Sequence, residues 1–412
     1  MSIVLYKNIG LTDNDVNGQT STVGETNIAN NGRQFFFTGN WYASRSLDNG
    51  VTWSYTSPVS TLPSAGGGFC CDQSLIYEPT RDILVWVLQY ARSNNTNTLR
   101  IAVKQGKTLD DDEWHWWDFR PEAVNAGWAG QWFDYNHVAT SNNYLYVGSN
   151  VFTVTGDSFT RCLLLRFPLD ALQAGSQLTY SYFSAENNFS LRCVQGARDT
   201  MYFAAHNTTS QLRLFSWPEN SATVSSTNVN VTLWQDNQQR RYAAPGPDGN
   251  DWLSRCDGRI TGAWVANGVI GFAWSANREA GERPFPFVRV VRLAEASKVV
   301  IDEPDIWNRT YGFAYPAVCP NKRGDVGLTL CRGGGSIHPG HVVGAWNQAQ
   351  LKWELTATRN GTHGPDDGKW GDYLGISQYS GNGMSWLANG FVLRNGSGRT
   401  SIEPRLVQFY RR

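Results

Sequence analysis

Acidic, basic and aromatic side chains recur at the start of seven short segments, each of which continues into an apolar run. The spacing from one start to the next is 46 to 65 residues. Carboxyl, imidazole and phenol groups move protons, and guanidinium groups hold anions and hydroxyl groups. If these starts meet in space, they form one concave polar site from distant parts of the chain. The segments begin near Glu25, Cys71, Asp134, Arg192, Asp257, Tyr315 and Asp372.

Carboxyl groups are the first candidates for catalysis at such a site. Two of them can act as the acid and the base that transfer a glycosyl group to water. A histidine or a tyrosine near the same place can also move protons. The predicted catalytic residues are Asp72, Asp134, His137, Tyr315 and Asp372. The same carboxylates could instead bind Ca²⁺, which favours several oxygen ligands. No other cofactor is expected, because the histidine spacing matches no standard zinc pattern.

Arginines and aromatic residues at the same starts are candidates for ligand binding. The planar guanidinium group of arginine binds a carboxylate or a pair of hydroxyl groups through two parallel hydrogen bonds. Tryptophan and tyrosine can stack on a sugar ring, although most of them are expected in the core. The predicted substrate-binding residues are Glu25, Arg192, Arg255, Arg259, Trp370 and Tyr373.

The repeat itself predicts the architecture that would bring these residues together. Each segment is long enough for four short strands, and long helical periodicity is absent apart from a short stretch at 168–174. We therefore expect an all-β fold, a seven-bladed β-propeller that occupies residues 1–412 as a single domain. The alternating runs Ser2 to Asn8 and Glu403 to Tyr410 would close the ring, and at least one of them would complete a blade built by the other terminus.

One turn gives a more specific indication of the fold. The string Ser46 to Trp53 (SLDNGVTW) lies between the run Arg33 to Arg45 and the run Trp53 to Ser57, which predicts a β-hairpin. It resembles the Asp-box of sialidase-like β-propellers at every defining position. The resemblance implies a propeller blade, and it implies an arginine cluster that grips an acidic sugar. The sequence lacks the Arg-Ile-Pro string and the clear Tyr-Glu pair of true sialidases, so the resemblance does not transfer sialidase activity.

Composition narrows the class of partner. Lys and Arg together number 35, as do Asp and Glu, and there is no basic block. A nucleic-acid or membrane partner is therefore not expected. The N-terminus reads as a strand and not as a signal peptide, so we expect a cytoplasmic protein or one whose leader has been removed. Seven scattered cysteines do not form a disulfide framework, although the adjacent pair Cys70 and Cys71 could be oxidised or reduced.

These observations favour an enzyme, a hydrolase or lyase that acts on a sugar or sugar acid at the mouth of the channel. A non-catalytic glycan-binding lectin and a scaffold for protein partners are the alternatives. A lectin repeats one pocket between blades, whereas the segment starts here differ from one another, which favours one central site. The sequence leaves the substrate and the oligomeric state open.

Overall fold

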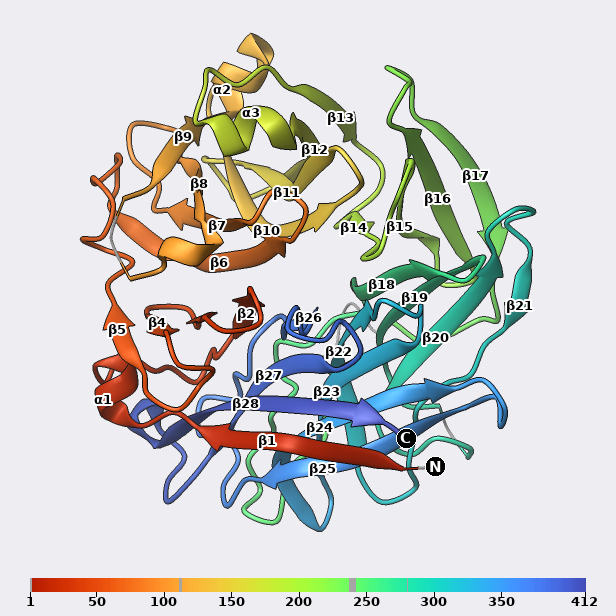
Figure 1. Cartoon of the computed structure of the whole chain (residues 1–412). Coiled ribbons are helices and arrows are strands. Elements are labelled where there is room, and N and C mark those ends of the chain that lie inside the picture. Colours follow the sequence, from red (N-terminus) through yellow and green to blue (C-terminus); the bar gives the residue numbers. More distant parts are fainter. Residues whose placement is uncertain (1, 111–112, 237–241, 280) are drawn as a thin grey trace.

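The computed structural model describes residues 2–110, 113–236, 242–279 and 281–412. Within these ranges seven antiparallel sheets of four strands each surround a central channel (Figure 1). The chain is therefore a seven-bladed β-propeller, as the spacing of its polar segments predicts.

The strands of the first four blades follow the chain from the innermost to the outermost position. Blade 1 contains β2 (Asn27–Asn30), β3 (Phe35–Thr38), β4 (Ala43–Ser46) and β5 (Ser54–Thr56). Blade 2 contains β6 (Phe69–Glu78), β7 (Ile83–Tyr90), β8 (Leu99–Gln105) and β9 (His115–Phe119). Blade 3 contains β10 (Gln131–Thr140), β11 (Tyr144–Thr153), β12 (Phe159–Pro168) and β13 (Ser181–Ala185). Blade 4 contains β14 (Arg192–Cys193), β15 (Thr200–Thr208), β16 (Gln211–Pro218) and β17 (Ser225–Asn230).

Two further blades repeat this order, and the seventh is built from both ends of the chain. Blade 5 contains β18 (Ile260–Ala266), β19 (Val269–Ala276), β20 (Phe287–Ala294) and β21 (Val300–Asp302). Blade 6 contains β22 (Gly312–Pro320), β23 (Val326–Gly334), β24 (Ile337–Asn347) and β25 (Lys352–Asn360). Blade 7 contains β26 (Ile376–Gln378), β27 (Trp386–Leu393), β28 (Ile402–Arg411) and β1 (Ile3–Gly10).

Helices are few and short in the described part of the chain. The stretch expected to be helical at 168–174 forms α3 (Leu169–Ala174), which follows directly after β12. The others are α1 (Asp13–Val16), α2 (Pro121–Val124) and the single 3₁₀ turns η1 (Gly106–Thr108), η2 (Ala126–Trp128) and η3 (Arg399–Ser401). None of the helices in the described ranges is long and apolar enough to cross a membrane.

The N-terminal strand closes the ring, as expected from the sequence. β1 pairs antiparallel with β28 and becomes the outermost strand of the blade that the C-terminal segment builds (Figure 1). Ile3 and Leu5 of β1 pack on the cluster that holds Trp386 and Phe409. Pairing therefore covers an edge of β28 and buries apolar surface at the same time.

The turn after β4 is the hairpin predicted for residues 46–53, because β4 pairs with β5. Asp48 accepts hydrogen bonds from the Thr52 hydroxyl at 2.6 Å and the Thr52 backbone N–H at 2.9 Å. The Ser46 hydroxyl accepts one from the Gly50 N–H at 2.7 Å. The preceding run from Arg33 is two strands and not one, because it turns back at residues 39–42.

The core consists of clusters inside and between the blades. Of the 18 tryptophans, many are fully buried, including Trp86, Trp217, Trp264, Trp274 and Trp386. Every residue of β7 is buried, since this second strand of its blade is covered on both faces by neighbouring blades. The abundance of aromatic residues therefore reflects mainly blade packing.

We predict that deletion of residues 400–412 abolishes the cooperative unfolding transition. The deletion removes the third strand of blade 7 and leaves β1 without a partner, so the ring opens and two sheet edges are exposed. Thermal unfolding followed by circular dichroism tests this. The substitution Tyr6→Ala, at an exposed side chain of β1, is the control and should change little. A truncated protein that melts like the intact chain would contradict the role of the strand.

A second prediction concerns the hairpin turn. Asp48→Ala should lower the free energy of unfolding by about 1 kcal/mol, since several hydrogen bonds to one carboxylate are lost. These hydrogen bonds hold the pKa of Asp48 at about 2. The stabilisation is therefore present above the unfolded pKa near 4 and declines as the pH falls towards 2. Urea unfolding of Asp48→Ala and of Val51→Ala, an exposed neighbour, measures both effects. Equal urea unfolding midpoints for the two variants at pH 7 would refute the stabilising role of the Asp48 hydrogen bonds.

Candidate functional site

All seven segment starts lie within a few residues of the beginning of an innermost strand. Glu25 precedes β2, Arg259 precedes β18 and Asp372 precedes β26, while Asp72 and Asp134 lie within β6 and β10. Arg192 begins β14 and Tyr315 lies within β22. Because innermost strands surround the channel and start at the same end of it, these residues gather at one mouth.

Bulges turn several of these side chains away from the regular ladder. In β6 the pairing with β7 lapses between Phe69 and Gln73, in β10 between Asp134 and His137, and in β22 between Ala314 and Ala317. A bulge inserts extra residues, bends the strand and re-aims side chains. Tyr135 and Tyr315, in two of the bulges, have φ of 56° and 58°, values that residues other than glycine seldom adopt. Strain of this kind is concentrated at functional sites.

A carboxyl cluster forms the centre of the mouth. Glu25 is buried, and its Oε1 accepts a hydrogen bond from the Asp372 backbone N–H at 3.1 Å. Burial, followed by the nearby Asp72 and Asp372 carboxylates, raises the pKa of Glu25 well above its usual value. Asp72 is partly buried, and burial together with Asp134 and Asp372 raises its pKa to about 8. Asp134, which accepts a hydrogen bond from Gln89 Nε2 at 3.0 Å, also has a raised pKa, mainly because of burial.

Arginines flank this cluster on one side. Oδ2 of Asp372 lies 3.8 Å from Arg259 Nη1 and 3.9 Å from Arg255 Nη2. Arg259 also forms a two-pronged ion pair with Asp257, with N–O distances of 2.9 Å and 2.6 Å. The Arg255 side chain is 44% exposed, so its guanidinium group is accessible to a ligand. Asp372 is thus a carboxylate held between two positive charges.

Tyr135 is a site residue that the sequence analysis did not select. The Arg259 guanidinium carbon lies 4.3 Å from the centre of its ring, and the Tyr373 ring contacts it edge-on at 6.0 Å. Its hydroxyl oxygen is buried without a hydrogen-bond partner. The charges of Arg259 and Arg192 both act on it, which places Arg192 on the same side of the site. Its position directly after Asp134 was the available signal, but nothing in the sequence shows the bulge that turns it inward.

Other predicted residues lie deeper than a ligand at the mouth can reach directly. Trp370 is 1% exposed, stacks on Phe391 and donates its indole N–H to the Cys331 sulfur. Tyr315 is buried against the thiol of Cys256. Both residues pack in one hydrophobic cluster, so stacking on a sugar by Trp370 is not supported.

His137 and Tyr373 belong to the channel rather than to the open mouth. Both are buried and line a cavity of about 300 Å³ that runs between the innermost strands. Burial, with the Arg192 charge, lowers the pKa of His137 well below its usual value. His137 is therefore neutral at ordinary pH and does not fit the role of a proton shuttle. The Tyr373 hydroxyl contacts the backbone of Gln73 and helps to hold β6 in place.

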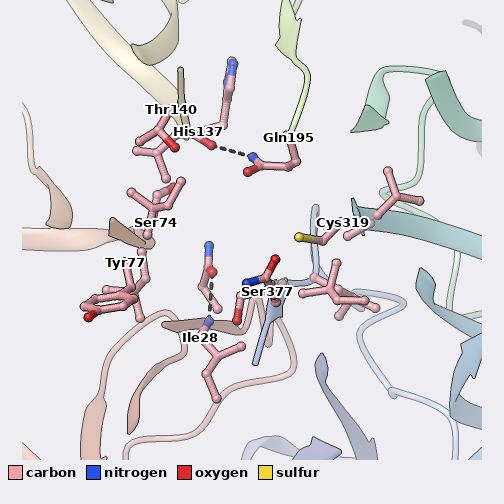
Figure 2. Close-up of a pocket in the computed structure, with 18 of the residues that line it drawn as sticks. Ile28, Ser74, Tyr77, His137, Thr140, Gln195, Cys319 and Ser377 are labelled. Carbon is pink, nitrogen blue, oxygen red and sulfur yellow. Dashed lines mark hydrogen bonds between the residues drawn. The ribbon is translucent and has the colours of Figure 1, made fainter. Parts of the chain in front are cut away.

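The channel cavity adjoins the carboxyl cluster. Figure 2 shows Ser74, Gln195 and Ser377 around the hollow, with Cys319 on another side. Gln195 donates a hydrogen bond to the Val138 carbonyl at 2.9 Å and so ties blade 4 to blade 3. The lining is uncharged apart from Arg192, whereas the carboxyl groups are concentrated at the mouth. The titratable carboxyl groups are therefore gathered at the mouth and not along the channel.

A metal centre is not evident within the described residues, where no group of three or more His, Cys, Asp or Glu side chains is arranged to hold an ion. The Ca²⁺ alternative stays a prediction.

Comparison with known proteins gives little beyond the fold. No family model matches the sequence, and no curated protein matches it. An α-L-arabinofuranosidase from Fusarium graminearum is 10% identical with a TM-score of 0.47, over 99% of this chain and 97% of that one. A neuraminidase-like protein of A/little yellow-shouldered bat/Guatemala is 8% identical with a TM-score of 0.42, over 80% and 95%. The SapL1 lectin, in complex with alpha methyl fucoside, is 10% identical with a TM-score of 0.44, over 84% and 99%. Similarity at this level carries no activity over to this chain.

The raised pKa of Asp72 leads to a prediction about stability. Between the unfolded pKa near 4 and the folded pKa of about 8, the folded state binds more protons than the unfolded state, so this residue lowers stability as the pH rises. Asp72→Asn should therefore melt several degrees above the wild type at pH 8 and close to it at pH 5. Thermal melts at both pH values test this, with Asp366→Asn, an exposed aspartate, as the control. If the difference in melting temperature between Asp72→Asn and the wild type were the same at both pH values, Asp72 would not be a buried acid.

Proposed function

We propose that this protein is a glycoside hydrolase whose active site is the carboxyl cluster at the channel mouth. The supporting observation is the different surroundings of two carboxyl groups at this mouth. Asp72 keeps its proton at neutral pH because burial raises its pKa to about 8, while Asp372 lies between Arg255 and Arg259. Hydrolysis of a glycosidic bond requires one protonated carboxyl group and one carboxylate.

Each residue has a defined role in this proposal. Asp72 donates its proton to the leaving oxygen, and Asp372 acts as the carboxylate that stabilises the sugar or activates water. Glu25 accepts a hydrogen bond from the backbone N–H of Asp372 and holds the loop that carries it. Arg255, the most exposed arginine of the site, binds hydroxyl groups of the substrate.

The charge balance favours a neutral, hydroxyl-rich sugar over a sugar acid. Five carboxyl groups, Glu25, Asp72, Asp134, Asp257 and Asp372, lie near three arginines, Arg192, Arg255 and Arg259. Arg259 is already bound to Asp257 and Arg255 lies 3.9 Å from Asp372, so two of the three guanidinium groups already face an internal carboxyl group.

Hydrolysis is favoured over the lyase alternative. A lyase needs a base at the reacting carbon, and burial lowers the pKa of His137, the histidine predicted for that role, well below its usual value. The resemblance of residues 46–53 to the Asp-box of sialidase-like propellers supports a propeller blade and does not support sialidase chemistry.

Activity measurements with a panel of neutral and acidic aryl glycosides and oligosaccharides test the proposal. Asp72→Asn should lower kcat by about 100- to 10,000-fold, the range for loss of a general acid, with little change in KM. In the wild type, activity should fall above pH 8, because Asp72 loses its proton there. Asp366→Asn is the control and should be fully active. Glycan binding without turnover would instead identify a lectin, and an active Asp72→Asn variant would refute the proposed acid.

A further inference from the structure

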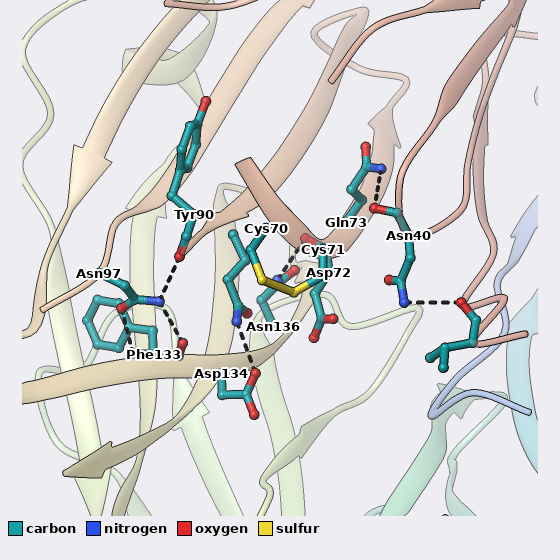
Figure 3. Close-up of a disulfide and its surroundings, with 12 residues drawn as sticks. Asn40, Cys70, Cys71, Asp72, Gln73, Tyr90, Asn97, Phe133, Asp134 and Asn136 are labelled. Atoms are coloured by element: carbon teal, nitrogen blue, oxygen red, sulfur yellow. Dashed lines mark hydrogen bonds between the residues drawn. A yellow bond between two sulfur atoms is a disulfide. The ribbon is translucent and has the colours of Figure 1, made fainter. Parts of the chain in front are cut away.

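The adjacent cysteines Cys70 and Cys71 form a disulfide bond that the proposed function does not use. Both are partly exposed, and Asp72 follows them directly in the chain. Figure 3 shows the disulfide and the Asp72 side chain next to each other. The bond therefore lies at the mouth, beside the residue assigned as the acid.

The disulfide occupies an irregular stretch of β6. Phe69 pairs with Tyr90 and Gln73 pairs with Leu88, so the three residues 70–72 lie opposite Gln89 alone. Two residues are thus surplus to the ladder, and the strand must bulge by that amount. The regular pairing that would otherwise fix the backbone of Asp72 is missing.

The two ends of the bulge are held very differently. On the C-terminal side, Gln73 is fully buried, donates to the Gly39 and Tyr42 carbonyls at 2.6 Å and 3.1 Å, and accepts from the Trp86 indole N–H at 2.8 Å. On the N-terminal side, the chain enters through Gly66, Gly67 and Gly68, and the last two have φ of 85° and 74°. Gly68 donates its N–H to the Ala65 carbonyl at 3.0 Å and accepts from the Ala91 N–H at 2.8 Å, but the three glycines have no side chain that could hold the bulge as Gln73 does.

A disulfide between adjacent residues closes a small ring through the peptide bond that joins them. The ring restricts the backbone of Cys70 and Cys71 and supplies the restraint that the glycines lack. It also places two sulfur atoms beside the Asp72 carboxyl in place of flexible side chains. We propose that the Cys70–Cys71 disulfide is a positioning group that holds the Asp72 carboxyl in the site, so that a dithiol inactivates the site without unfolding the propeller.

The reductive step is a thiol–disulfide exchange with a dithiol such as dithiothreitol. The sulfur–sulfur bond of the protein breaks, each cysteine gains a proton, and the dithiol is oxidised to its cyclic disulfide. The other five cysteines do not compete, since burial raises the pKa of each thiol and keeps it protonated. An alkylating reagent added after reduction therefore marks Cys70 and Cys71 selectively.

Titration of Asp72 reports its position directly. The groups that act on this carboxyl come from several blades, so any displacement changes its surroundings. They are Glu25, Asp134, Arg259, Asp372 and Tyr373. A merely structural cross-link would change the melting temperature and leave this titration where it was.

The experiment compares the oxidised wild type, the dithiol-treated and alkylated wild type, and a Cys70→Ser/Cys71→Ser variant. The Asp72 carboxyl carbon is followed by NMR with labelled aspartate and assigned with Asp72→Asn. We expect Asp72 to titrate near pH 8 in the oxidised protein and at least one pH unit lower in the other two, with circular dichroism unchanged. Cys319→Ser, at a partly buried free thiol, should behave like the wild type before and after reduction.

Activity is the second readout and rests on the proposed function. Reduction should lower kcat at least tenfold, reoxidation should restore it, and the double serine variant should not respond to dithiol. Unchanged titration of Asp72 after reduction would overturn the positioning role, even if activity fell. If the wild type hydrolyses no glycoside, the proposed function fails while the titration still decides the role of the disulfide. If the serine variant does not fold, reduction of the folded wild type gives the same comparison.

Discussion

Closure of the ring by β1 on β28 is the constraint on which the rest of the structure depends. Seven sheets can surround a channel only if the first and the last are joined, and here the join is a strand from one terminus in a blade from the other. The pairing runs the length of β1 and brings Arg411 and Ile3 opposite each other. Without it, neither the channel nor the convergence of the innermost strands would exist, and residues from Glu25 to Asp372 would not share a site.

The inner strands give up regular pairing where the site requires it. Four of them bulge, in blades 2, 3, 5 and 6, and two of the bulges hold a tyrosine at positive φ. Each bulge sacrifices ladder hydrogen bonds, and each tyrosine at positive φ costs on the order of 1–3 kcal/mol of backbone strain. The packed blades behind these strands compensate for that cost, which is why a closed β scaffold can carry an irregular site.

Burial and charge act against each other at the mouth. Withdrawal from water raises the pKa of Glu25, Asp72 and Asp134, whereas Arg259 lowers the pKa of Asp257. The result is a cluster in which the pKa values of neighbouring carboxyl groups are shifted in opposite directions. Within the proposed function this favours a neutral ligand, because Arg259 is already paired with Asp257 and Asp372 lies close to both Arg255 and Arg259. The resemblance to sialidase-like propellers, in contrast, implies that the arginines grip an acidic sugar.

The sequence by itself determined the architecture. The seven polar starts correspond to the seven innermost strands, and the terminal runs are β1 and β28, within two residues at each end. Such features are local: alternation, turn residues and spacing can be read along the chain. The hairpin at Asp48 belongs to the same class, since its hydrogen bonds join residues only a few positions apart.

Only the tertiary structure decided what each site residue does. Trp370 and Asp372 are two positions apart, yet one is in the core and the other lies between two arginines. His137 and Tyr135 are also two positions apart in sequence. The bulge in β10 nevertheless directs His137 into the channel and places Tyr135 against the Arg259 guanidinium group. Burial, protonation and ion pairing depend on groups contributed by distant blades, and no pattern within a segment contains that information.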